Sequence, residues 1–245
     1  MRLMLVALIS TPMTFTVNLN GNMVYGNKET SLLGGKVSLT RDVYPWEYEA
    51  SLSGTYGTAK VGDSSEVTAN NGRGLLRLDR YITERVEVFV FGSSEYDRIM
   101  NLENRSEGGA GAKYVFLKSE GAKLSVSAAL LGGYERFLGD TVSRYPIRLS
   151  IRPMGRFDMG NFGSLSFVLF YQPNVMEFGT DYRVFGDLTY SVSLTKFVAF
   201  NLIFKYNYDG YVASQSKDTA SSLYGIKPYE FNLLLGLSMK VPLER

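Results

Sequence analysis

Apolar and polar residues alternate along most of this chain, and the connections between the alternating stretches are short. The clearest block runs from Asp79 to Phe137, where Val86, Val88 and Val90 share one side and Glu87 lies on the other. Because a β-strand repeats every two residues, each such stretch predicts a strand with one apolar and one polar face. Charges along a whole face need water, and a continuous apolar face needs surroundings that exclude it. The chain is therefore limited to an all-β fold in which the polar strand faces contact water and the apolar strand faces are shielded from it.

The alternation begins near Phe15 and continues to Val241. It is least regular from Glu66 to Tyr81, where Leu75 and Leu76 are adjacent. The stretches amount to about twelve strands, and an even number of antiparallel strands is typical of single-chain bacterial outer-membrane barrels. We therefore predict an all-β, antiparallel up-and-down transmembrane β-barrel of about 12 strands.

Tight and longer connections alternate along the chain. The tight ones are 43–45, 83–84, 118–121, 160–162 and 195–196, and the longer ones are 60–65, 99–103, 173–180 and 209–226. Short turns on one rim and longer loops on the other are the periplasmic and extracellular asymmetry of outer-membrane barrels. This pattern predicts that both termini are periplasmic and that 209–226, rich in Ser and Tyr, is the main extracellular loop.

The composition fits a membrane barrel but leaves one alternative open. The chain has 17 Tyr, 15 Phe and 25 Gly but only 7 Pro, and its mean hydropathy of -0.06 is too polar for a bundle of membrane helices. The alternation alone does not say which face is inside, so a soluble or periplasmic β-barrel carrier of a hydrophobic ligand is the competing interpretation. Strand length and aromatic residues on the apolar face, such as Phe200, Phe204 and Tyr206, favour the membrane barrel.

The first residues have the character of a secretory signal. Arg2 is followed by a short apolar run from Leu3 to Ile9, which is far below the ~20 apolar residues that a membrane helix needs. We expect residues 1–13 to be the remnant of a signal peptide and residues 14–245 to form a single β-barrel domain.

The residue counts exclude several kinds of chemistry. The chain has no His and no Cys, so a Ser-His-Asp nucleophile, a His-bearing zinc site and thiol chemistry are impossible. Two carboxylate pairs, Glu47 with Glu49 and Glu95 with Asp97, each share one strand face, but carboxylates beside Arg and Lys on a wet face are more typical of solvated ion pairs. We predict no catalytic residue, no cofactor, no metal and no enzymatic activity. A net charge of +2 gives no reason to expect nucleic acid.

If the apolar faces meet lipid, the charged faces point into the barrel. Both signs are present in similar number, so opposite charges should pair across the interior and narrow it. Arg148 and Arg152, four residues apart on one strand face, could form with Arg183 a basic track for anionic solutes. The candidate lumen-lining residues are Lys36, Arg73, Arg77, Glu87, Glu95, Lys113, Glu135, Arg148, Arg152, Arg183, Asp187, Lys205 and Glu230.

Several short motifs carry a resemblance to a known family. They are Tyr25-Gly26-Asn27, Arg80-Tyr81, Glu95-Tyr96-Asp97-Arg98, Gly109-Ala110-Gly111 followed by Tyr114, and Gly132-Gly133-Tyr134-Glu135. With these motifs the chain resembles the salt-induced outer-membrane protein family of bacteria, from roughly Val17 to its end. The resemblance implies a location in the Gram-negative outer membrane, with outer-membrane lipid and the barrel-assembly machinery as partners. It names no reaction, so we expect a narrow channel for small solutes or a structural protein of envelope stress.

Overall fold

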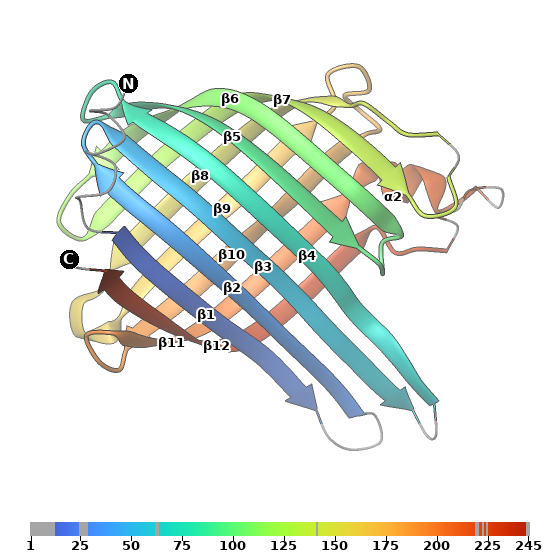
Figure 1. Cartoon of the computed structure of the whole chain (residues 1–245), viewed down its shortest axis with the longest axis horizontal. Helices are drawn as coiled ribbons and strands as arrows, with labels where there is room; N and C mark the ends of the chain where they lie inside the picture. The colour runs from blue at the N-terminus through green and yellow to red at the C-terminus, as the bar shows by residue number, and fades with distance from the viewer. Residues whose placement is uncertain are drawn as a thin grey trace.

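The computed structural model describes residues 13–24, 29–61, 64–140, 142–218, 221, 223 and 225–243. In this part of the chain, twelve antiparallel strands form a closed barrel in which each strand pairs with its neighbours in sequence and β1 pairs with β12 (Figure 1). The predicted fold class is confirmed. The strands are β1 Met13–Val24, β2 Glu29–Val43, β3 Trp46–Val61, β4 Ser64–Tyr81, β5 Val86–Asp97, β6 Leu102–Lys118, β7 Ala122–Phe137, β8 Ile147–Asp158, β9 Ser164–Pro173, β10 Tyr182–Ser193, β11 Val198–Asp209 and β12 Tyr229–Leu243.

The two ends of the barrel differ in their connections. Met13 and Leu243, the first and last described residues, pair with each other at one end, which we call the turn end, and helix α2 (Gly210–Gln215) lies at the other, the loop end (Figure 1). The turn end carries the connections 44–45, 82–85, 119–121, 159–163 with the short helix η1 (Gly160–Phe162), and 194–197; the loop end carries 98–101, 138–146, 174–181 and 210–228.

One expected connection is wrong. The sequence suggested a longer loop over 60–65, but β3 extends to Val61 and β4 begins at Ser64, and Lys60 pairs directly with Ser65. The register shifts once, between Gly57 and Thr58, and the pairing then extends to Val61 with Ser64.

The apolar faces point outward. Leu52 and Leu76 are 71% and 67% exposed, whereas Glu135 and Arg148 are each 1% exposed inside the barrel. A soluble carrier would have the opposite arrangement, with its apolar face buried, so the structure contradicts the soluble-carrier interpretation. Among the described residues, no helix is long and apolar enough to cross a membrane.

Two of the sequence irregularities have local explanations. Leu75 lines the barrel interior while Leu76 faces outward, so the period of β4 is intact and Leu75 is an apolar residue at an inward position. On β6, a Cβ atom at Gly109 would lie 2.7 Å from Leu131 Cδ2, and one at Gly111 would lie 2.6 Å from Ala129 Cβ. The glycines of this strand therefore allow the close approach of β7.

Two predictions fall outside the described residues. Residues 1–12 of the expected signal remnant and the Tyr25-Gly26-Asn27 motif both belong to the undescribed part of the chain. The signal remnant and the extent of the 14–245 domain stay predictions.

Candidate functional site

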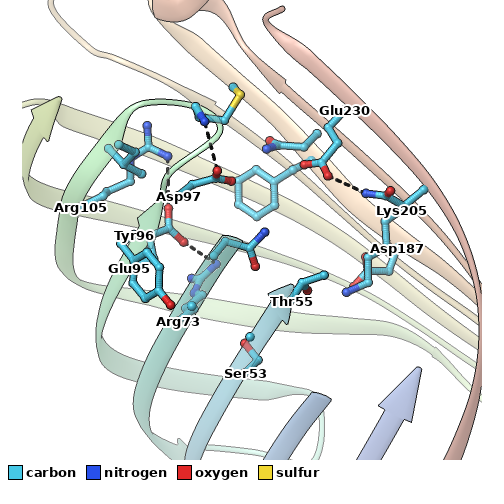
Figure 2. A pocket seen from close by; sticks show the side chains of 18 of the residues that line it. Ser53, Thr55, Arg73, Glu95, Tyr96, Asp97, Arg105, Asp187, Lys205 and Glu230 are labelled. Atoms are coloured by element: carbon cyan, nitrogen blue, oxygen red, sulfur yellow. Dashed lines mark hydrogen bonds and ion pairs between the residues drawn. The ribbon is translucent and has the colours of Figure 1, made fainter. Parts of the chain in front are cut away.

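A cavity of about 460 Å³, which we call the chamber, lies inside the barrel (Figure 2). Figure 2 shows Asp187, Lys205 and Glu230 on one wall and Arg73 and Glu95 on the facing wall. Its volume is within the usual range of about 300–1,000 Å³ for small-molecule sites. The predicted lumen residues that line the chamber are Lys36, Arg73, Glu95, Arg183, Asp187, Lys205 and Glu230.

Some charged side chains of the chamber form ion pairs and others do not. Arg73 lies 3.5 Å from Glu95, and Lys36, 3.2 Å from Glu49, is paired as well. Asp187 and Lys205 are opposite each other in the register of β10 and β11, yet neither has an ion-pair partner within 4.0 Å among the described residues. These two opposite charges are available to a solute in the chamber.

Part of the chamber wall is aromatic. Phe170 on β9 and Phe185 on β10 stack with ring centroids 4.5 Å apart and planes at 10°, and both line the cavity. The guanidinium of Arg152 lies 5.4 Å from the centroid of the Phe170 ring. Stacked rings give the chamber a flat apolar surface beside its charges.

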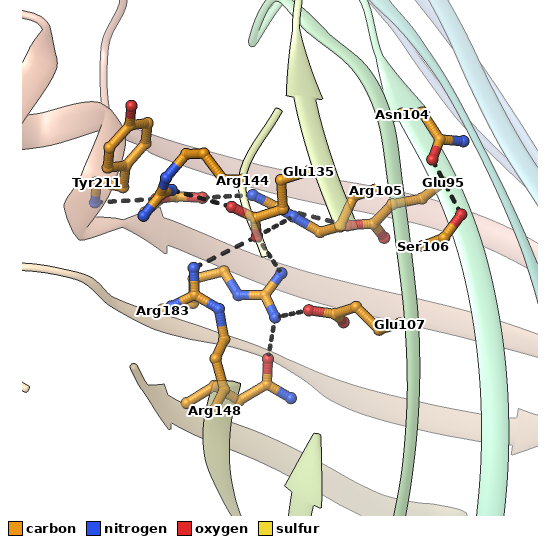
Figure 3. A network of polar contacts seen from close by, with 12 residues as sticks. Glu95, Asn104, Arg105, Ser106, Glu107, Glu135, Arg144, Arg148, Arg183 and Tyr211 are labelled. Atoms are coloured by element: carbon orange, nitrogen blue, oxygen red, sulfur yellow. Dashed lines mark hydrogen bonds and ion pairs between the residues drawn. The ribbon is translucent and has the colours of Figure 1, made fainter. Parts of the chain in front are cut away.

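A set of ion pairs that we call the loop-end network borders the chamber (Figure 3). Glu135, which is almost fully buried, accepts hydrogen bonds from Arg105 Nε at 2.9 Å, Arg144 Nη1 at 3.0 Å and Arg148 Nη2 at 3.3 Å. Three guanidinium groups around one carboxylate offset its desolvation. The members of the network are Glu95, Arg105, Glu107, Glu135, Arg144, Arg148, Asp181, Arg183 and Asp209.

Asp181, in the connection between β9 and β10, is the second anchor of the network. It accepts from Arg144 Nη2 at 2.6 Å, Arg148 Nη1 at 2.7 Å and Asn174 Nδ2 at 3.0 Å. Burial by itself would raise the pKa of Asp181, but attraction to Arg148 and hydrogen bonds from Arg148, Asn174 and Arg144 outweigh it and hold the pKa below its usual value. The carboxylate is therefore ionised at neutral pH.

Arg183 connects opposite walls of the barrel. From β10 it pairs with Glu107 on β6 and lies 3.9 Å from Glu135 on β7, and it donates to Gln172 Oε1 at 2.7 Å. Arg148 and Arg183 are thus neutralised by carboxylates. The basic track suggested for Arg148, Arg152 and Arg183 is wrong, because only Arg152 lacks a carboxylate partner within 4.0 Å among the described ion pairs.

The connection 210–228 closes the network from the loop end. Val212 of α2 and Leu223 are each 1% exposed and pack against Leu102 and Phe137. The ring of Tyr211 lies 3.4 Å from the Arg144 guanidinium. The expected main extracellular loop is therefore partly folded into the barrel end and contributes an apolar layer above the ion pairs.

The remaining predicted residues lie in smaller clusters. Arg77 forms a bidentate pair with Asp79 at 2.6 and 2.7 Å, and Lys113 pairs with Glu87. Arg152 donates to Ser127 Oγ at 3.1 Å. Beside them, four apolar side chains on the inner faces of β5 and β7 occupy space that the sequence had assigned to polar residues: Phe89, Phe91, Ala129 and Leu131.

Sequence reasoning missed five members of the network: Arg105, Glu107, Arg144, Asp181 and Asp209. Arg105 and Glu107 follow a register shift between Leu102 and Asn104, which obscures the alternation at the start of β6. Arg144 and Asp181 belong to connections rather than strands, where alternation gives no signal. No group of His, Cys, Asp or Glu among the described residues has the geometry of a metal site.

A closed twelve-stranded barrel with an apolar exterior and buried ion pairs inside is a β-barrel of the outer-membrane type. The chain belongs to the family described as "Protein of unknown function, DUF481", whose profile matches residues 17–225. No curated protein matches this chain in sequence.

Solved structures share the fold. An outer membrane channel from Pseudomonas putida F1 is 12% identical with a TM-score of 0.55, over 96% of this chain and 96% of that one. The NanC porin is 9% identical with a TM-score of 0.52, over 94% of this chain and 100% of that one. At these identities the likeness establishes a common barrel architecture.

Proposed function

We propose that this protein is an outer-membrane barrel that admits small polar solutes to its chamber through a narrow conduit. The observation that carries the proposal is the chamber itself, where Asp187 and Lys205 have no ion-pair partner among the described residues while most of the other predicted lumen charges are paired. Charges left uncompensated in a cavity attract solutes of matching charge. The similar fold of an outer membrane channel and a porin supports this assignment.

The same proposal includes location and partners. The apolar exterior suits outer-membrane lipid, and insertion there would involve the barrel-assembly machinery. The salt-induced character implied by the motif resemblance would link the protein to envelope stress. It would be tested by measuring transcript and protein levels after an osmotic upshift.

We infer no enzymatic role. The chain has no His or Cys to act as base or nucleophile near neutral pH, and the buried carboxylates Glu135 and Asp181 are held by guanidinium groups. Screens on phospholipid, peptide and ester substrates should show no turnover. Activity that disappears on replacing one chamber carboxylate would overturn this inference.

A structural role in the envelope is the second candidate. The loop-end network favours it, because ion pairs between β6, β7 and β10 brace the barrel across its interior. A brace needs no solute path, so a barrel without measurable conductance would be assigned this role.

Ion conductance in planar bilayers separates the two candidates. We expect small, discrete currents from the native protein and larger ones when 211–226 is replaced by a short Gly-Ser linker. Replacing Lys205 with Gln should shift the reversal potential toward cation preference, and Asp187→Asn should shift it toward anion preference. The matched control is Lys118→Gln, an exposed lysine outside the chamber. If none of the variants conducts, the conduit proposal fails.

A further inference from the structure

One wall of the chamber places aromatic and charged side chains in two adjacent rows. Phe170 on β9 is opposite Phe185 on β10, and Phe185 is opposite Asn207 on β11; we call these three residues the aromatic row. Asp187 and Lys205, which are opposite each other on β10 and β11, form the charged row next to it. All five residues line the chamber. Because residues two apart on a strand share a face, the two rows are only about 7 Å apart.

The charged row differs from other opposite charges that face each other across neighbouring strands. Asp187 and Lys205 lie on the same wall in Figure 2, yet neither forms an ion pair with the other or with any other described residue. One ligand group that carries both signs can therefore meet an uncompensated charge on each side. The cross-strand charges that do form ion pairs include Lys113 with Glu87, Arg73 with Glu95, and Arg105 with Glu135.

The aromatic row offers a ring face for stacking. The rings of Phe170 and Phe185 have planes at 10° and centroids 4.5 Å apart, so each covers one face of the other. The Arg152 guanidinium approaches Phe170 from β8, the side away from β10, at 5.4 Å from the ring centroid. Phe185 makes no further ring or cation contact among the described residues, and its neighbour on β11 is Asn207, which has a short side chain. A planar ring can therefore stack on Phe185 above Asn207.

We propose that this wall binds a zwitterion with a planar ring, of the class of the aromatic α-amino acids. The ring stacks on Phe185, the ammonium group contacts Asp187 and the carboxylate group contacts Lys205. In these molecules two bonds separate the ring from the carbon that carries both charged groups, so one molecule reaches both rows. A ligand of a single charge would leave either Asp187 or Lys205 uncompensated. The inference rests on the proposed function, because the ligand must be admitted to the chamber, but binding does not require ion conduction.

Equilibrium dialysis of the detergent-solubilised barrel against radiolabelled L-tryptophan measures the binding, and empty micelles give the background from partitioning. Unlabelled compounds then compete with the label. L-Phenylalanine keeps the ring and both charges, whereas indole lacks both charges, tryptamine lacks the carboxylate, indole-3-propionate lacks the ammonium group and glycine lacks the ring. We expect L-phenylalanine to displace the label and the other four to be at least about tenfold weaker. The absence of saturable binding, or equal competition by any of those four, overturns the proposal.

Variants in the wall assign each contact. Asp187→Asn should abolish the preference for L-tryptophan over indole-3-propionate, and Lys205→Gln should abolish the preference over tryptamine. Phe185→Leu should weaken L-tryptophan binding several-fold, whereas the matched Phe91→Leu, an inward phenylalanine outside the chamber, and the exposed Lys118→Gln should not change it. Heat-dependent migration on a denaturing gel verifies that each barrel is folded. Preferences that persist in the first two variants, or equal losses in the two phenylalanine variants, overturn the site.

Bilayer currents separate this inference from the proposed function. Saturable binding without conductance supports the site and defeats the conduit, whereas conductance without saturable binding does the reverse. Where the barrel both binds and conducts, L-tryptophan added to the bath should reduce the current of the wild type but not that of Asp187→Asn/Lys205→Gln. An undiminished wild-type current would mean that the bound molecule lies outside the chamber, and the site would be overturned.

Discussion

Arg105 and Asp209 form an ion pair across the barrel interior, with Arg105 Nη2 2.8 Å from Asp209 Oδ2, although 104 residues separate them. The same carboxylate accepts hydrogen bonds from the backbone N–H groups of Tyr211 and Val212 and so caps the first turn of α2. Asp209 therefore ties the connection 210–228 to the wall at β6. The network and the loop above it form one unit.

Replacing Asp209 should loosen that unit. Asp209→Ala removes the cap, which is worth about 1 kcal/mol, and one of the three carboxylates around Arg105. Asp209→Asn is the matched control, because its side-chain oxygen can still cap the helix while the charge is lost. We expect faster proteolysis within 210–228 and larger conductance for Asp209→Ala, with Asp209→Asn intermediate. Wild-type behaviour in both variants would show that Asp209 does not hold the loop.

Arg148 should matter more for stability than a surface arginine. Arg148→Ala leaves Glu135 and Asp181 buried with fewer partners, and breaking a buried ion pair typically costs about 3–5 kcal/mol. The control is Arg136→Ala, which breaks the exposed pair with Glu103 and should cost about 0–1 kcal/mol. Denaturant unfolding in lipid vesicles measures both. A similar loss for the two variants would contradict a stabilising role for the network.

The strands and their faces could be predicted from the sequence because alternation is a local property. Val86, Val88 and Val90 mark the outward face of β5 without reference to any other strand. Phe89 and Leu131 could not be placed in the same way, because their apolar side chains occupy inward positions. Phe89 is opposite Gly111 and Leu131 is opposite Gly109, so the two side chains meet over the glycines of β6 only when three strands pair in this register.

Most of the network was hidden for a similar reason. Arg105 meets Asp209 because β6 faces β11 across the interior, and this depends on strand number and register together. One sequence signal for the loop above the network, a helix N-cap pattern, was not used in the prediction. An Asp followed by Gly-Tyr-Val-Ala-Ser-Gln at 209–215 is a helix N-cap pattern, and it predicts α2.

The glycines of β6 and β7 provide a test of close packing. In Gly111→Ala the new Cβ would lie 2.6 Å from Ala129 Cβ, so β6 and β7 must shift, at a cost of about 1–3 kcal/mol. Gly132→Ala is the control, since a Cβ there meets nothing within 4 Å, and it should be neutral or slightly stabilising. Denaturant unfolding should separate the two variants. If Gly111→Ala is as stable as Gly132→Ala, the strands are less closely packed than the structure shows.

A charge placed on the outside should reveal the lipid-facing surface. Leu202 on β11 faces outward, whereas Asn207 on the same strand lines the chamber. Leu202→Arg should lower the free energy of unfolding from a bilayer by about 2–4 kcal/mol if the residue lies near the midplane. Asn207→Arg should change it far less, because its side chain faces water. The reverse order would mean that the apolar face is not the lipid-facing one.

Acid should destabilise the folded loop end by protonating Asp181. The pKa of this residue is held below its usual value of 3.8, although burial by itself would raise it. A carboxyl with a lowered folded pKa contributes stability that is complete above its unfolded pKa and is lost as the pH falls through the folded value. The wild-type protein should therefore keep this contribution at about pH 7 and lose it below about pH 4. Asp181→Asn should be less stable than the wild type at neutral pH, and the difference should shrink as the pH falls, as measured by denaturant unfolding across that range. Parallel losses in the two proteins would mean that the pairs with Arg144 and Arg148 contribute nothing to stability.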